Sequence, residues 1–73
     1  MILVGFDRAT GRFATQAAVP HGSWSAAWQI ANVPASDPDL LGSYSLTDAQ
    51  VRQIATVAQI ILDVRFEWIL EAS

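Results

Sequence analysis

The chain has 73 residues, no cysteine and a formal net charge of −3, with an isoelectric point near 4.6. Its four cationic side chains are all arginines, too few to form the basic stripe that nucleic-acid binding requires. Without cysteine, neither a disulfide framework nor a thiolate metal site can form.

Hydrophobic residues make up 52% of the chain, which is more apolar material than a monomer of this size easily covers. This excess favours a surface for a protein partner or a homodimer. No apolar run approaches the length of a membrane span, and the first residues lack the basic leader and long apolar core of a signal peptide. We therefore expect a cytoplasmic protein that contacts no membrane.

Two strands joined by a tight turn are expected at the start of the chain. Ile2–Phe6 reads as a strand with Ile2, Val4 and Phe6 on one face, and Arg12–Val19 as the returning strand. Pro20 ends the pairing because it has no amide to donate. Between the strands, Asp7 can hold a turn through its side chain, and Gly11 can take the left-handed conformation. The pattern predicts a β-hairpin.

A short helix follows, from about Trp24 to Ala31, with Ser23 as its expected N-cap and Asn32 at its end. Trp24 and Trp28 lie one turn apart on this helix. We interpret them as anchors that fix the helix to the sheet. The alternative is an exposed aromatic pair that docks a partner.

The next segment, residues 33–42, is interrupted by two prolines and is expected to be irregular. Asp37 can cap a single turn over Pro38–Leu41, which Gly42 would close. A short strand containing Tyr44 is expected directly before the main helix.

The strongest helical signal spans Leu46–Leu62. Thr47 and Gln50 have the spacing of a capping box, in which each side chain satisfies the backbone amide of the other residue. Apolar residues then recur at helical spacing on one face. We expect four aliphatic side chains of this helix to be buried, namely Val51, Ile54, Ile61 and Leu62.

The final segment, Asp63–Glu71, alternates cleanly with period two from Asp63 to Trp68, which predicts a strand. No glycine or proline separates it from the preceding helix, so a continued helix remains the alternative. The strand is favoured because pairing with Ile2–Phe6 would bury two rows of large side chains. One face would carry Val64, Phe66, Trp68 and Leu70, and the other Asp63, Arg65, Glu67, Ile69 and Glu71.

Together these elements predict one α+β domain over residues 1–73. Its expected order is a β-hairpin, a short helix, a short strand, a long amphipathic helix and a C-terminal strand. The economical packing is a mainly antiparallel sheet with both helices on one face.

Catalytic and metal-binding patterns are weak. His21 and Ser23 share a turn, but residues two apart rarely aim both side chains at one point, and no carboxylate nearby would orient the histidine. Asp37 and Asp39 flank a proline without the further oxygen ligands of an EF-hand loop. We expect no enzymatic activity, no metal and no cofactor.

Two acidic groups are the candidate partner-binding residues. One lies on the last strand and comprises Asp63, Glu67 and Glu71, with the apolar Ile69 among them. The other comprises Asp37, Asp39 and Asp48, near the start of the main helix. Either group can serve as solvated surface or meet a cationic site on a partner protein, which would raise the association rate and the specificity.

Part of the sequence resembles small uncharacterised bacterial α+β domains. The resemblance is carried by Asp37-Pro-Asp-Leu-Leu-Gly-Ser-Tyr-Ser-Leu-Thr47, by Gln50, and by Phe66-Glu-Trp-Ile-Leu-Glu71. Some small acidic proteins of this kind are similar to immunity proteins, which are encoded beside bacterial toxins. The resemblance implies an antitoxin-type inhibitor that occludes the basic active site of a toxin, and it assigns no functional residues. The alternative is a homo-oligomeric structural or accessory subunit without catalytic activity.

Overall fold

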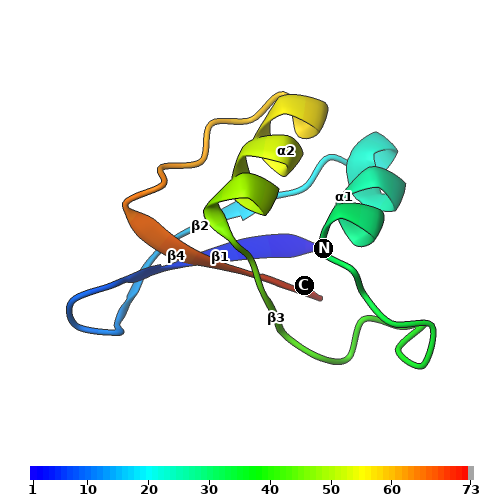
Figure 1. Ribbon diagram of the computed structural model, residues 1–73, viewed down its shortest axis with the longest axis horizontal. Coiled ribbons are helices and arrows are strands. Elements are labelled where there is room, and N and C mark those ends of the chain that lie inside the picture. The colour runs from blue at the N-terminus through cyan, green and yellow to red at the C-terminus, as the bar shows by residue number, and fades with distance from the viewer. Residues whose placement is uncertain (73) are drawn as a thin grey trace.

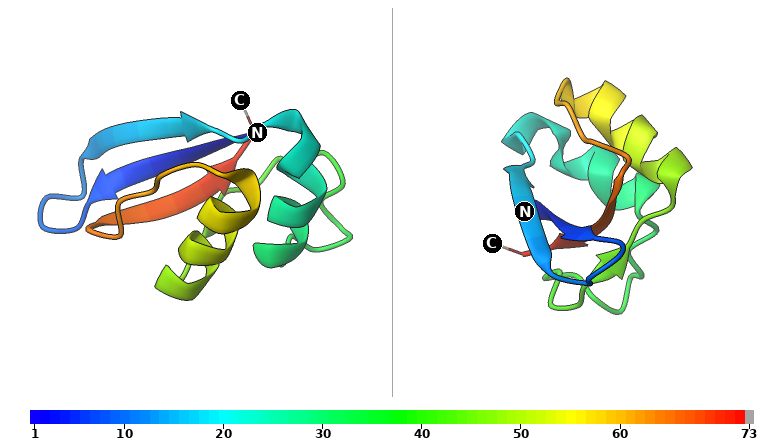
Figure 2. Two further views of the ribbon diagram at one scale, coloured as in Figure 1. Left: turned by 90° about the horizontal axis from the view of Figure 1, so that it is seen from above. Right: turned by 90° about the vertical axis from the view of Figure 1, so that its left-hand side faces the viewer.

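The computed structural model describes residues 1–72 and has two layers, a four-stranded antiparallel sheet and a pair of helices packed on one of its faces (Figures 1 and 2). The sheet has the strand order β2-β1-β4-β3, so β1 and β4 are central. The predicted α+β class and element order are confirmed. In chain order the elements are β1 (Ile2–Asp7), β2 (Phe13–Ala18), the 3-10 turn η1 (His21–Ser23), α1 (Trp24–Ile30), β3 (Tyr44–Ser45), α2 (Asp48–Ala58) and β4 (Phe66–Glu71).

The hairpin between β1 and β2 forms as predicted. One carboxylate oxygen of Asp7 accepts hydrogen bonds from the backbone N–H groups of Ala9 and Thr10, at 2.8 and 3.0 Å. Gly11 has a φ of 71°, the left-handed conformation that glycine adopts without steric cost. The register shifts by one residue between Gly5 and Phe6, which leaves a bulge in β2.

The segment before the C-terminus is a strand, and the alternative of a continued helix is wrong. β4 pairs antiparallel with β1, so that Leu70 lies opposite Leu3 and Trp68 lies opposite Gly5. A Cβ atom at Gly5 would lie 3.2 Å from the Trp68 ring and 3.1 Å from the Thr15 side chain. Gly5 therefore lets the indole lie directly on the sheet, which no larger residue allows without a shift.

The main helix begins as predicted. The Thr47 hydroxyl accepts a hydrogen bond from the Gln50 N–H at 3.2 Å, and the Gln50 side chain accepts one from the Thr47 N–H at 2.8 Å. The Gln50 amide also donates to the carbonyl oxygen of Ile30, which ties α2 to the end of α1.

The predicted end of this helix is wrong. α2 stops at Ala58 because Gln59 adopts the left-handed conformation and the Ile60 N–H bonds the Ala55 carbonyl, as in a Schellman motif. The prediction that Ile61 is buried is also wrong, since 98% of its surface is exposed. Leu62 is buried, but it reaches the core from the loop that follows the helix.

The short helix α1 ends in the same way. Asn32 has a φ of 57°, and the Val33 N–H bonds the Trp28 carbonyl at 3.3 Å. At its start, the Ser23 side chain makes no capping hydrogen bond, contrary to expectation. The chain instead enters through η1, where the Ser23 N–H bonds the carbonyl of Pro20.

The hydrophobic core lies between the sheet and the helices. Side chains from α1, from α2 and from the inward face of β1 and β4 build it, together with side chains from the connecting loops. Its buried members are Leu3, Val19, Ala27, Ala31, Val33, Leu40, Leu46, Val51, Ile54, Leu62, Trp68 and Leu70.

Candidate functional site

The two faces of the sheet differ because successive residues of a strand point to opposite sides. On β4, Trp68 and Leu70 join the core, whereas Ile69 points away from the helices. We call the helix-free side the open face (Figure 2). Strand pairing assigns it Ile2, Val4 and Phe6 of β1, Phe13, Gln16 and Ala18 of β2, Ser45 of β3, and Glu67, Ile69 and Glu71 of β4.

Apolar side chains run across the middle of the open face. Val4 pairs with Ile69 on one side, and Phe6 pairs with Phe13 on the other. Val4 is buried without belonging to the core cluster, because its neighbours on this face cover it. Phe13 is 60% exposed at the hairpin end. A phenylalanine this exposed beside other apolar groups is typical of a contact surface.

Two glutamates border these apolar groups. Glu67 lies opposite Phe6, and Glu71 lies opposite Ile2, so the two carboxylates are about 13 Å apart along β4. Glu71 accepts a hydrogen bond from the Ser43 hydroxyl at 3.0 Å. Neither glutamate takes part in an ion pair with the described residues.

The structure does not place Asp63 with these glutamates. β4 begins only at Phe66, so Asp63 and Arg65 precede the strand instead of lying on its face. Their side chains form an ion pair at 2.7 Å, and the Asp63 carboxylate also accepts the Arg65 N–H. These bonds hold the pKa of Asp63 below its ordinary value and leave its charge neutralised locally.

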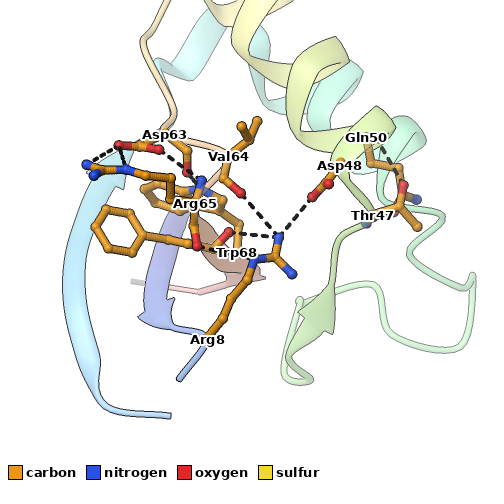
Figure 3. Close-up of polar contacts among 9 residues, drawn as sticks. Arg8, Thr47, Asp48, Gln50, Asp63, Val64, Arg65 and Trp68 are labelled. Atoms are coloured by element: carbon orange, nitrogen blue, oxygen red, sulfur yellow. Dashed lines mark hydrogen bonds and ion pairs between the residues drawn. The ribbon is translucent and has the colours of Figure 1, made fainter. Parts of the chain in front are cut away.

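Arg8 organises the same end of the molecule, a role for which the sequence contains no signal. Its guanidinium donates to the carbonyl oxygens of Arg65 and Phe66 at 3.2 and 3.1 Å and forms an ion pair with Asp48 at 2.9 Å (Figure 3). One side chain thus joins the hairpin loop, the start of β4 and the first turn of α2. Its partners are distant in sequence, so only the folded chain reveals them.

The second acidic group is not one cluster. Asp48 pairs with Arg8, Asp37 is bonded within its own loop, and Asp39 is exposed. Asp37 accepts hydrogen bonds from the Tyr44 hydroxyl and from the N–H groups of Leu41 and Gly42, the last two at 2.7 and 2.9 Å. The bond from Tyr44, followed by the two backbone bonds, lowers the pKa of Asp37, and the same bond raises the pKa of the tyrosine hydroxyl. Asp37 therefore holds its loop in a turn, although not the helical turn that we expected.

Asp39 is exposed and borders a hollow of about 380 Å³. Trp24 and Trp28 of α1 line the same hollow. The sequence left open whether they anchor the helix or form an exposed aromatic pair, and each has features of both. Trp28 packs against the core, and Trp24 is 39% exposed while its indole N–H bonds the carbonyl of Val19 at 2.8 Å. No pattern in the sequence brings Asp39 to these rings.

Within residues 1–72, no group of three or more His, Cys, Asp or Glu side chains is arranged to hold a metal ion. The ring of His21 packs edge-on against Trp24, with ring centroids 4.4 Å apart. Of the described helices, neither has the length and hydrophobicity that crossing a bilayer requires.

The chain matches no protein-family model, no curated protein and no solved structure. The likeness to immunity proteins therefore remains an expectation from the sequence.

Proposed function

We propose that this chain is a small protein-binding module, of the type represented by immunity proteins, that presents its open face to a basic protein partner. The combination on one face of exposed Phe13, adjoining apolar side chains and two glutamates without ion pairs supports this proposal most. Apolar groups supply the contact area, and the carboxylates select a cationic partner. The corresponding partner is a toxin with a basic active site, such as a nuclease, which the open face would cover.

The distribution of charge supports a basic partner. Two of the four arginines, Arg8 and Arg65, are ion-paired to aspartates at the hairpin end of the sheet. The acidic excess of the chain is therefore carried by the remaining carboxylates, among them Glu67 and Glu71 on the open face. Complementary charge of this kind accelerates association and disfavours acidic partners.

Affinity capture tests the proposal, with the tagged chain and a lysate of the organism that encodes it. The informative variant carries Glu67→Gln and Glu71→Gln, which removes two charges from the open face. A control with Gln53→Lys and Thr56→Lys changes the net charge by the same amount on exposed positions of α2. We expect wild type and control to retain one basic protein in stoichiometric amount and the double glutamine variant to lose it.

The captured protein then identifies the activity. If it is a toxin, purified wild-type chain inhibits it and the double glutamine variant does so only at higher concentration. Equal capture by the two charge variants would contradict the role of the open face. The absence of a stoichiometric partner from the wild-type capture would contradict the proposed function as a whole.

A homo-oligomeric subunit is the second candidate, and strand β2 favours it. β2 is an edge strand, and its six residues, Phe13–Ala18, include no charge or proline to discourage pairing with another strand. The Val19 N–H bonds the Met1 carbonyl, so Val19 is a hydrogen-bonded position of the ladder between β2 and β1. Because such positions alternate along an antiparallel strand, the N–H and C=O groups of Gln16 and Ala18 point away from β1, to the free edge. Two copies can join antiparallel through these groups.

Light scattering distinguishes this candidate. Gln16→Pro removes an outward N–H that β1 does not use, so it blocks edge pairing while leaving the hairpin bonded. A dimer that dissociates in this variant would support the homo-oligomeric subunit. A wild-type chain that stays monomeric at micromolar concentration would exclude edge pairing at that concentration.

A further inference from the structure

The hollow beside α1 is formed by three parts of the chain. Trp24 and Trp28 come from the helix, and Pro38, Asp39 and Leu40 come from the loop before β3. Met1 and Ala72 close it at the end of the sheet where β1 begins and β4 stops, opposite the hairpin loop (Figure 1). Its volume of about 380 Å³ falls within the range typical of small-molecule sites.

Both tryptophans are held in place by other parts of the chain, and part of each side chain still lines the hollow. The indole N–H of Trp24 is satisfied by the Val19 carbonyl, so the exposed part of that side chain is apolar ring. The His21 ring packs against the same side chain in a T-shaped arrangement. Trp28 packs against the core on one side and lines the hollow on the other. The third tryptophan, Trp68, is buried elsewhere in the core and bonds the Asp63 carbonyl.

Asp39 brings a carboxylate to the hollow. Asp39 is the one charged side chain among the described lining residues, and no ion pair within residues 1–72 engages it. The neighbouring Asp37, by contrast, is occupied by Tyr44 and two backbone amides. A carboxylate at the edge of an indole-lined hollow repels anions. A neutral apolar ligand would remove water from the carboxylate without supplying an opposite charge.

We propose that this hollow binds a small organic cation that carries an alkylated ammonium group. The faces of the indole rings attract such a group through their quadrupoles, its methyl groups fill apolar volume, and Asp39 balances its charge. A metal ion is disfavoured because the hollow offers a single carboxylate. The site lies apart from the open face, so the proposal does not depend on the function proposed above.

Nuclear magnetic resonance of the three indole N–H groups, with choline as the probe, tests this site. We expect choline to shift the signals of Trp24 and Trp28 in a saturable manner and to leave that of Trp68 in place. The uncharged isostere 3,3-dimethyl-1-butanol has the same shape, so its affinity should be at least about fivefold lower if the charge is recognised.

A matched pair of variants tests whether Asp39 is the carboxylate that recognises the positive charge of choline. Asp39→Asn and Glu67→Gln each remove one negative charge from an exposed side chain, the first at the hollow and the second on the open face. We expect choline affinity to fall about fivefold in the first and to stay unchanged in the second.

Four results would overturn the proposal. They are a lack of saturable shifts at Trp24 and Trp28 with millimolar choline, equal binding of the neutral isostere, equal choline affinity in the two variants, and binding of a trimethyllysine peptide without binding of choline. The last would assign the hollow to a protein side chain instead of a small molecule.

Discussion

The two faces of the sheet are built from the same strands, but the helices cover only one of them. On β4, Trp68 and Leu70 are 3% and 0% exposed beneath the helices, whereas Glu67 and Ile69 point to the helix-free side. A fully buried aliphatic side chain such as Leu70 contributes about 1.5–3 kcal/mol to stability. On the open face, the three side chains of β4 are exposed or only partly buried. The difference shows that alternate residues of one strand either build the core or stay accessible, which is the arrangement that the proposed partner contact requires.

The largest expected effect comes from comparing neighbours on β4. Leu70→Ala removes a fully buried side chain and should lower the free energy of unfolding by about 2–5 kcal/mol. Ile69→Ala removes a side chain of similar size from the open face and should cost about 1 kcal/mol. Urea denaturation followed by tryptophan fluorescence measures both. Equal losses would mean that the open face is covered in solution.

A smaller loss of stability is expected at Gly5, where the absence of a side chain lets Trp68 lie close to the sheet. Gly5→Ala places a methyl group 3.1–3.2 Å from the Thr15 side chain and the indole, and should cost about 1–3 kcal/mol. Gly22→Ala is the control, since a Cβ there meets no atom within 4 Å. If both variants unfold at the wild-type urea concentration, the indole does not lie where the structure has it.

How much of this fold the sequence predicts depends on how local each signal is. The capping box of Thr47 and Gln50 and the alternation along β4 involve neighbouring residues, and both were predicted. The end of α2 was not, because Gln59 takes a left-handed conformation that sequence rules assign to glycine or asparagine. Tertiary packing of Leu62 accompanies that turn, and no local pattern encodes it.

The same distinction applies to the candidate site. Glu67, Ile69 and Glu71 were predicted to share a face because strand alternation determines it. The inclusion of Asp63 on that face was wrong, since its ion pair with Arg65 forms before the strand begins. The hollow beside Trp24 was missed, because its lining residues meet only when the loop, α1 and the ends of the sheet come together.

The pH dependence of stability tests the role of Asp37 in the loop before β3. Bonds from Tyr44 and from two backbone amides lower the pKa of Asp37 below its ordinary 3.8, so the unfolded chain binds this proton more readily than the folded chain. Asp37 therefore contributes stability above pH 3.8 that is lost as the pH falls through the lower, folded pKa. Asp37→Asn should be less stable than wild type at neutral pH and lose less stability on acidification.

Tyr44→Phe provides the matching control for this pH dependence. It removes the largest cause of the lowered pKa of Asp37 while leaving the backbone bonds from Leu41 and Gly42. Its loss of stability on acidification should lie between those of wild type and Asp37→Asn. Asp7 and Asp63, whose pKa values are also lowered, account for the acid sensitivity that remains. Identical acid profiles in all three proteins would contradict the role of Asp37.

The smallest effect is expected at Ile61, where the sequence and the structure disagree most. A helix continued to residue 62 would bury Ile61, but its side chain is 98% exposed beyond the end of α2. Ile61→Ser should therefore change the free energy of unfolding by no more than about 0.5 kcal/mol. Leu62→Ala, one residue later but in the core, should cost about 2–5 kcal/mol. A large loss at Ile61 that grows with protein concentration would show that a second copy covers it, whereas a loss independent of concentration would show that the helix continues.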